Sequence, residues 1–187
     1  PANVTSIGSS AFEDTTSLTS VTFAPGSQLI SIGNSAFNRA TKLTSITIPG
    51  SVTSIGDSAF EDATSLTSVT FAPGSQLINI GSSAFNNATA LPSINIPANV
   101  TSIGSFAFSN ATALNSIVIP ASVTSIDNQA FRNTTALVSI TVDGANPSYS
   151  STSGVLFNKN STTLITYPSN KNNTFYAIPT SVTIIGN

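Results

Sequence analysis

A repeated Ala-Phe dipeptide constrains the fold of this chain more than any other feature of its sequence. The six phenylalanines follow one another at intervals of 25, 23, 25, 23 and 23 residues, and a leucine lies six residues after each. A unit this short cannot bury its own apolar side chains, but stacked copies bury them against each other. The sequence therefore predicts a repeat solenoid with one continuous core. The phenylalanines are Phe12, Phe37, Phe60, Phe85, Phe108 and Phe131, and the leucines are Leu18, Leu43, Leu66, Leu91, Leu114 and Leu137.

Each unit is expected to contribute one strand to a parallel sheet on the concave face of the solenoid. Apolar residues alternate with Ser and Thr after each leucine, which is the pattern of a half-buried strand. A proline usually follows and ends the pairing, because proline has no N–H group; Pro92 is instead expected to mark the start of a strand. The predicted strands are residues 20–23, 45–48, 68–71, 93–96, 116–119 and 139–142.

The other side of each coil is expected to hold a second short extended piece, such as residues 52–55, and then a bend. A glycine permits the bend in five units, while the sixth has Asp127 in its place. The Ala-Phe dipeptide is then expected to lie in a helical turn on the convex face. Two units have 25 residues because their turns, at residues 23–29 and 71–77, are two residues longer than the turn at 48–52.

The repeated unit resembles the BspA-like class of leucine-rich repeat. In this sequence it reads Ile-Pro-x-Ser-Val-Thr-Ser-Ile-Gly-x-x-Ala-Phe-x-x-Ala-Thr-x-Leu-x-x-Ile-x-Ile, in register over residues 1 to 142. The class usually has Cys three residues after the Phe, where this chain has Ala or Thr. The resemblance implies a right-handed, β-rich superhelix. It also implies a cell-surface or secreted setting, since many members of the class are implicated in adhesion.

The chain is expected to divide into three parts. Residues 1–142 hold the six repeats, and residues 143–177 form an irregular unit with an inserted β-hairpin, whose strands at 149–157 and 163–167 flank a turn-rich segment at 158–162. Residues 178–187 begin a further, truncated repeat. Both ends are therefore expected to expose core that no capping unit covers, which would permit end-to-end contacts between copies.

Composition excludes several classes of function. The 187 residues include no His and no Cys, five Lys and Arg, and seven Asp and Glu, for a net charge of -2. Such a chain has no imidazole base, Cys nucleophile or zinc site, and no basic patch for nucleic acid or for a membrane surface. No apolar run is long enough for membrane insertion. We expect no enzyme activity and no cofactor.

The acidic residues are the remaining candidates for chemistry. Glu13 and Asp14, like Glu61 and Asp62, are adjacent, but neighbouring side chains point different ways and no base or nucleophile accompanies them. We expect instead an ion ladder on an outer turn, with Arg39 between Asp14 and Asp62, because the three occupy the same position in consecutive units. Asp57, Asp127 and Asp143 stand singly and do not form a calcium loop, so no metal site is expected.

Three tyrosines, Tyr149, Tyr167 and Tyr176, all lie in the irregular last part of the chain. They could contact carbohydrate or protein. We favour a structural role in which their rings cover the apolar side of the hairpin and their hydroxyls stay in water.

The candidate binding face is the set of outward-facing strand residues, here called the hydroxyl array. Stacking places them in two columns at about 4.8 Å per strand. The array could bind a protein or glycan at a cell surface, or order water as ice-binding solenoids do, although Ser and Thr are also ordinary strand fillers. We predict a binding or adhesion module, with a structural spacer as the alternative and ice binding a distant third. The array consists of Ser20, Thr22, Ser45, Thr47, Ser68, Thr70, Ser93, Asn95, Ser116, Val118, Ser139 and Thr141.

Overall fold

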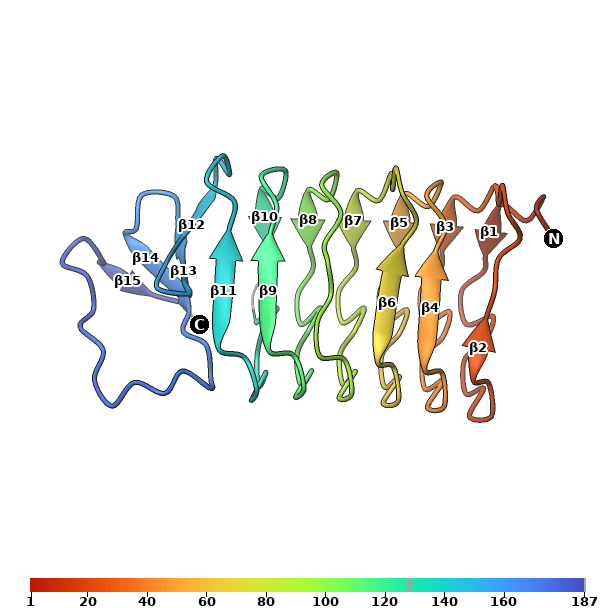
Figure 1. The fold of residues 1–187 in the computed structure, drawn as a ribbon, viewed down its shortest axis with the longest axis horizontal. Helices are drawn as coiled ribbons and strands as arrows, with labels where there is room; N and C mark the ends of the chain where they lie inside the picture. Colours follow the sequence, from red (N-terminus) through yellow and green to blue (C-terminus); the bar gives the residue numbers. More distant parts are fainter. Residues whose placement is uncertain (128, 187) are drawn as a thin grey trace.

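The computed structural model describes residues 1–127 and 129–186 and confirms the predicted solenoid. Its coils are stacked along the long axis of the molecule, with longer strands on one face and short strands on the other (Figure 1). Each predicted repeat makes one coil. No helix occurs in the described part of the chain.

The short strands form one continuous parallel sheet. Each has two residues, and each pairs with the equivalent strand of the neighbouring coil, Ser to Ser or Asn and Ile to Ile. The isoleucines point into the core. In spatial order the strands are β1 (Ser6–Ile7), β3 (Ser31–Ile32), β5 (Ser54–Ile55), β7 (Asn79–Ile80), β8 (Ser102–Ile103) and β10 (Ser125–Ile126).

The strands on the opposite face, which have four residues each except for the two-residue strand Ser20–Val21, form two sheets, so the prediction of a single sheet on this face is wrong. Residues 93–96 form no strand, and Figure 1 shows a coil without an arrow between β6 and β9. One sheet contains β2 (Ser20–Val21), β4 (Ser45–Ile48) and β6 (Ser68–Phe71), and the other contains β9 (Ser116–Ile119) and β11 (Ser139–Val142).

Pro92 explains the interruption. At the equivalent position the Thr67 N–H donates to the Thr44 carbonyl at 2.8 Å, but Pro92 has no N–H to donate to Thr67. The expectation that Pro92 begins a strand is therefore also wrong. The Asn115 N–H still donates to the Pro92 carbonyl at 3.0 Å, so the coil remains stacked although its pairing is broken.

The turn that carries each Ala-Phe dipeptide is left-handed at two residues, which corrects the predicted helical turn. Ser35 and Arg39 have φ of 54° and 56°. Their N–H groups donate to the backbone carbonyls of Asp57 and Glu61 in the next coil, both at 2.8 Å. In a helix these groups would bond within their own turn. The same conformation recurs at Ser10, Asp14, Ser58, Asp62, Ser83, Asn87, Phe106, Asn110, Gln129 and Asn133.

Glycine is required at four of the bends because adjacent coils approach closely there. A Cβ atom at Gly81 would lie 2.6 Å from the Gly56 carbonyl carbon and 2.7 Å from the Asp57 nitrogen. These neighbours are backbone atoms and cannot rotate away. Gly33, Gly56 and Gly104 face the same restriction, whereas a Cβ at Gly8 would meet nothing within 4 Å.

The core contains a stack of phenylalanine rings. Successive rings from Phe12 to Phe131 lie with centroids 5.0 to 5.9 Å apart and planes within 6° of parallel. The widest step, between Phe108 and Phe131, lies in the coil where Asp127 replaces the bend glycine. Phe12, which has one ring neighbour instead of two, is 36% exposed.

Residues 143–186 add a four-stranded sheet to the sixth coil. β12 (Tyr149–Thr152), β13 (Val155–Asn158) and β14 (Thr163–Thr166) are antiparallel, and β15 (Ile184–Ile185) pairs with β14 in parallel. The predicted strand 149–157 is thus two strands, separated by a turn at Ser153 and Gly154, both with positive φ. Asn187, the last residue of the predicted truncated repeat, lies outside the described residues.

This sheet covers the outer edge of β11. The Ile140 N–H donates to the Gly154 carbonyl and the Val142 N–H donates to Ser151 Oγ, both at 2.9 Å. The backbone edge of the sixth coil is therefore paired, because the hairpin supplies the acceptors that a further strand would supply.

Candidate binding surface

The hydroxyl array lies on the long-strand face, and most of its side chains are exposed. The pairing of β2, β4 and β6 brings Ser20, Ser45 and Ser68 into one column, and Thr47 beside Thr70 in the other. Thr47 Oγ1 and Thr70 Oγ1 are 2.9 Å apart and share a hydrogen bond. The array is therefore an exposed, uncharged surface in which some hydroxyl groups bond to each other between coils.

The array is less uniform than its sequence pattern. Ser93 and Asn95 are exposed but belong to no strand, and Val118 places an apolar side chain, 54% exposed, in the threonine column. Ser139 is half-buried because the hairpin turn lies against it, so that a Cβ at Gly154 would be 2.8 Å from Ser139 Cβ. The most regular part of the array runs from Ser20 to Thr70.

Two open clefts border this regular part, and the sequence pattern did not predict them. One, of about 540 Å³, lies between the turn after β6 and the next coil; the other, of about 440 Å³, occupies the equivalent place after β2. Phe71 and Pro97 line the first, as Phe23 and Pro49 line the second. The available signal was the two-residue extension of the turns at 23–29 and 71–77, which marks both clefts.

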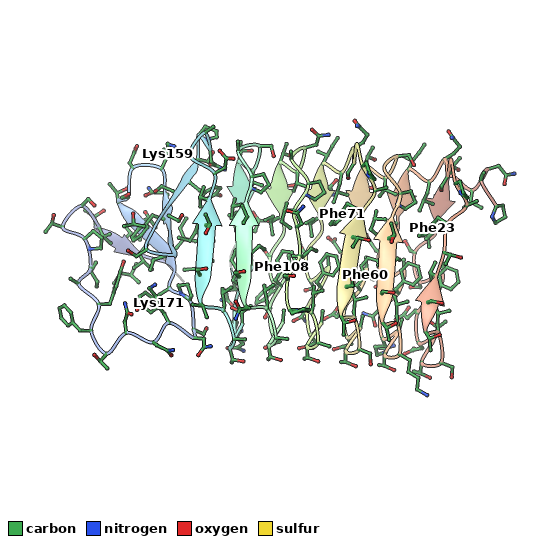
Figure 2. The ribbon with its side chains drawn as sticks, in the orientation of Figure 1. Phe23, Phe60, Phe71, Phe108, Lys159 and Lys171 are labelled. Atoms are coloured by element: carbon green, nitrogen blue, oxygen red, sulfur yellow. The ribbon has the colours of Figure 1, made fainter. Side chains whose placement is uncertain are left out.

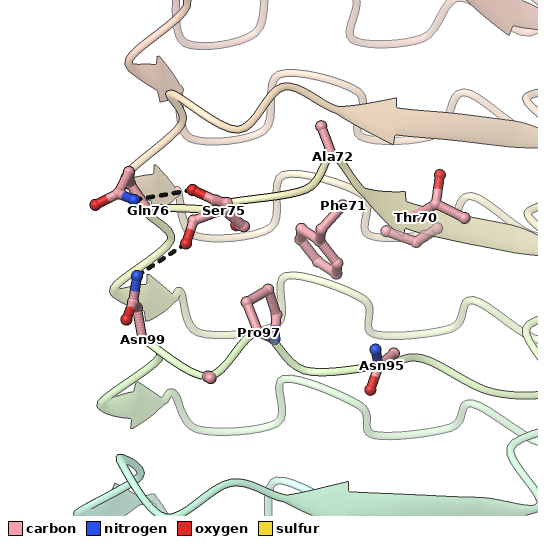
Figure 3. Close-up of a pocket in the computed structure, with 11 residues that line it drawn as sticks. Thr70, Phe71, Ala72, Ser75, Gln76, Asn95, Pro97 and Asn99 are labelled. Carbon is pink, nitrogen blue, oxygen red and sulfur yellow. Dashed lines mark hydrogen bonds between the residues drawn. The ribbon is translucent and has the colours of Figure 1, made fainter.

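Figure 3 shows the first cleft, with the Phe71 ring directed toward the coil that carries Asn95 and Pro97. Phe23 and Phe71 lie in the same row of the molecule, on coils separated by one other coil (Figure 2). Both rings are half-buried, whereas Ile48, Ile96 and Ile119, which replace them in units with short turns, are buried. The longer turn therefore exposes an aromatic side chain beside the array.

The predicted ion ladder is present on one side only. The Arg39 guanidinium donates to both carboxylate oxygens of Asp14, at 2.5 and 2.7 Å, and lies 3.4 Å from Glu13 Oε1. This hydrogen-bonded pair lowers the pKa of Asp14 and raises the pKa of Arg39. Asp62 instead accepts from Asn87 Nδ2 at 2.7 Å, so the ladder continues through amides rather than ions.

Glu61 and Asp57 also make contacts between coils. Glu61 accepts from Asn86 Nδ2 at 2.7 Å, and Asp57 Oδ1 accepts from the Ser82 N–H at 2.7 Å. Among residues 1–127 and 129–186, no group of three His, Cys, Asp or Glu side chains could hold a metal ion. The acidic pairs thus have structural partners on the turns, away from the hydroxyl array.

The three tyrosines pack in two places: Tyr149 packs against the solenoid core, and Tyr167 and Tyr176 pack against the core of the hairpin sheet. The Tyr149 hydroxyl accepts from the Ile126 N–H at 2.7 Å, and burial raises the pKa of Tyr149. Tyr167 and Tyr176 meet edge to face at 4.7 Å and cover a small core of Val155, Phe157 and Leu164. Tyr149 and Tyr167 also line a cavity of about 720 Å³ between the sixth coil and the hairpin sheet.

The sequence that forms these stacked coils matches the family model of the BspA type leucine rich repeat region, in six copies over residues 1–79 and 72–181. The chain belongs to this family. A comparison with curated protein sequences gave no significant match. The BspA-type match describes a repeat region and indicates no family of enzymes.

Solved structures of leucine-rich repeat proteins share the fold of this BspA-type chain. A leucine-rich repeat protein from Eubacterium ventriosum is 32% identical with a TM-score of 0.76, over 90% of this chain and 43% of that one. The pneumococcal vaccine antigen PcpA is 28% identical with a TM-score of 0.64, over 98% and 47%. A leucine-rich repeat protein from T. pallidum is 30% identical with a TM-score of 0.60, over 65% and 56%.

This BspA-type chain therefore spans about half the length of the solved structures that it resembles. Its family is one of repeat modules found in bacterial proteins, and a binding or structural module is the function that this membership supports. A search of the described residues found no helix with the length and apolar character needed to cross a membrane.

Proposed function

We propose that this chain is a non-catalytic binding module of a cell-surface protein, which attaches to a protein or glycan through the hydroxyl array. The observation that carries the proposal is the row of mostly exposed, neutral polar side chains along one face, most regular from Ser20 to Thr70, with the acidic pairs bonded on the turns. Membership of a bacterial repeat family and likeness to a pneumococcal vaccine antigen support the surface setting.

Neutral hydroxyls attract partners over short distances only. Each module therefore binds weakly, and attachment increases when many copies act together. Because no charged residue belongs to the array, moderate changes in salt concentration have little effect on binding, unlike interactions that depend on long-range charge.

The test uses beads that carry many copies of the chain and a printed panel of neutral oligosaccharides and extracellular-matrix proteins. Ser116→Lys with Thr141→Lys places charge on the array, while Thr64→Lys with Thr112→Lys places the same charge on exposed turn residues. We expect the array variant to lose most of its bead attachment, since multivalent attachment falls steeply when each single contact weakens, and the turn variant to retain it. Equal attachment of all three, or no attachment of the parent chain to any probe, would overturn the proposal.

The second candidate is a structural spacer. The Thr47 to Thr70 hydrogen bond favours it, since part of the array is satisfied within the molecule. The bead experiment distinguishes the two functions, because a spacer attaches to no probe and is indifferent to charge on the array.

A further inference from the structure

The two clefts beside the hydroxyl array occupy equivalent positions in two different repeats and have equivalent linings. Both lie between a coil with a long turn and a following coil with a short turn. Their linings correspond position by position: Val21 to Val69, Thr22 to Thr70, Phe23 to Phe71, Thr47 to Asn95 and Pro49 to Pro97.

The long turn opens the cleft because it bonds to the coil before it. The Ala72 N–H donates to the Ile48 carbonyl and the Gln76 N–H donates to the Gly50 carbonyl, at 2.9 and 2.8 Å. Gly50 permits this approach, since a Cβ there would lie 3.1 Å from the Pro73 carbonyl oxygen.

On its other side the long turn has fewer backbone bonds. Pro97 occupies the position of Ala72 in the next coil and has no N–H to donate to Phe71. The Asn99 side chain donates to the Ser75 carbonyl at 2.8 Å and holds the far end of the turn (Figure 3). The space between, floored by Phe71 and Pro97, is the cleft.

The chemistry of both linings selects an uncharged occupant. Neither lining contains Asp, Glu, Lys or Arg. Each combines a half-exposed phenylalanine and a proline with hydroxyl or amide groups of the array, Thr22 and Thr47 in one cleft and Thr70 and Asn95 in the other. An apolar side chain fits against the rings, while the hydroxyl and amide groups can donate to carbonyl oxygens beside it.

The spacing of the clefts selects the conformation of the occupant. The equivalent positions of the two clefts are two coil-to-coil steps apart, which is about 9.6 Å at roughly 4.8 Å per strand. A polyproline II helix has three residues per turn and rises about 3.1 Å per residue, so every third side chain returns to the same face after about 9.3 Å. In an extended strand, side chains on the same face lie about 6.6 Å and then about 13 Å apart. Neither distance matches the spacing of the two clefts.

We propose that the paired clefts bind a proline-rich segment of a partner protein in the polyproline II conformation, with side chains three residues apart seated against Phe23 and Phe71. The inference rests on the proposed binding role and names the class of partner. Aromatic-lined grooves recognise such segments because a polyproline II helix is already ordered and its backbone carbonyls are free to accept hydrogen bonds.

The experiment titrates the intact chain with two synthetic peptides and follows amide NMR signals of the cleft turns. One peptide, acetyl-Leu-Pro-Pro-Leu-Pro-Pro-Leu-amide, places leucines in register with the clefts. The other, acetyl-Leu-Pro-Pro-Pro-Leu-Pro-Pro-Pro-Leu-amide, places them about 12.4 Å apart. We expect the first peptide to shift the signals of Ala24, Gly26, Ala72 and Gly74 and to bind about tenfold more tightly than the second, since the second can fill one cleft only.

Three lysine variants test the site. Thr47→Lys and Asn95→Lys each place charge in one cleft, and each is expected to weaken the first peptide about tenfold, while Thr112→Lys, on an exposed turn outside the clefts and the array, leaves it unchanged. All three positions are exposed, so the variants should fold. Absence of peptide binding, equal affinity for both peptides, or an equal effect of Thr112→Lys would overturn the inference.

A neutral β-linked N-acetylglucosamine hexamer serves as the competing probe. If the hexamer shifts the cleft signals and the peptides do not, the clefts bind glycan and the inference is wrong. Bead attachment that depends on Ser116 and Thr141, without peptide binding, would also refute it while leaving the proposed function intact.

Discussion

Phe106 has a left-handed backbone conformation that phenylalanine rarely adopts. It has φ of 58° and is 37% exposed, at a position where four other coils have serine. For a residue other than Gly, Asn or Asp this conformation costs about 1–2 kcal/mol. Evidently the bonds between coils outweigh that cost.

We therefore predict that Phe106→Asn raises the free energy of unfolding by about 0.5–1 kcal/mol, because asparagine tolerates positive φ. Phe106→Val is the control and is expected to lower it, since a β-branched side chain is the least suited to this conformation. Urea unfolding followed by circular dichroism measures both. A loss of stability in the Asn variant would show that packing of the Phe106 ring outweighs its backbone strain.

Asp14 provides a prediction on pH. Its pKa is lowered by the hydrogen bonds from Arg39. The pair therefore stabilises the fold above the unfolded pKa of about 3.9, and this contribution is lost as pH falls through the lower folded value. An NMR titration should find the Asp14 pKa below its ordinary value in the parent chain and higher in Arg39→Met, with Arg39→Lys between them. Identical titration in the parent chain and the Met variant would contradict the assignment.

At the scale of elements, the bend glycines show how closely the coils approach. We predict that Gly81→Ala costs about 1–3 kcal/mol or more, because the new methyl group would overlap backbone atoms of the preceding coil. Gly8→Ala is the matched control: its Cβ meets nothing, and a gain of about 0.4–1 kcal/mol is expected from reduced freedom of the unfolded chain. Thermal unfolding of both variants is the measurement, and similar losses in the two would refute the close-approach argument.

The break between the two long-strand sheets provides a second prediction for elements. Pro92→Thr restores an N–H that can donate to the Thr67 carbonyl, as the Thr67 N–H does to Thr44. We expect slow hydrogen exchange at the new amide and residues 93–96 paired as a strand. Pro73→Ala, which adds an N–H on an exposed turn, is the control for unprotected exchange. Equally fast exchange at both new amides would mean that Pro92 does not cause the break.

Much of the element structure was predictable because apolar residues recur at fixed intervals. The columns of Phe, Leu and Ile correctly located the core and the coils. The left-handed turns were missed because Ser, Asp and Asn at positions such as 35, 62 and 87 fit either an exposed helical turn or positive φ, and only bonds to the next coil distinguish them. The sheet break was missed because Pro92 was interpreted only as the start of its own strand. Its effect on the neighbouring coil, where the Thr67 carbonyl has no N–H to accept from, was not considered.

The candidate site was predictable in part for a similar reason. Alternation along the strands identified the outward-facing array, since it depends on local geometry alone. The clefts depend on which neighbouring coil a long turn approaches, and that is decided by Gly50 and Pro97 in other units. Likewise the partner of Asp62 was decided by Asn87, which competes with Arg39 from the opposite side.

At the scale of the whole molecule, the direction of the backbone bonds between coils determines how the protein responds to mechanical tension. Because the strands are stacked along the long axis (Figure 1), the bonds between coils run parallel to it, and under a pull along that axis the weakest interface separates first while the others stay intact. Release of one coil of 23 to 25 residues lengthens the chain by about 80 Å at roughly 3.5 Å per residue. Stretching single molecules between their ends should therefore give a series of small, similar steps rather than one large rupture. A solenoid that yields coil by coil dissipates work while most of its binding face stays folded, so contacts on the remaining coils survive a load that a cooperatively unfolding domain would transmit to all of them at once.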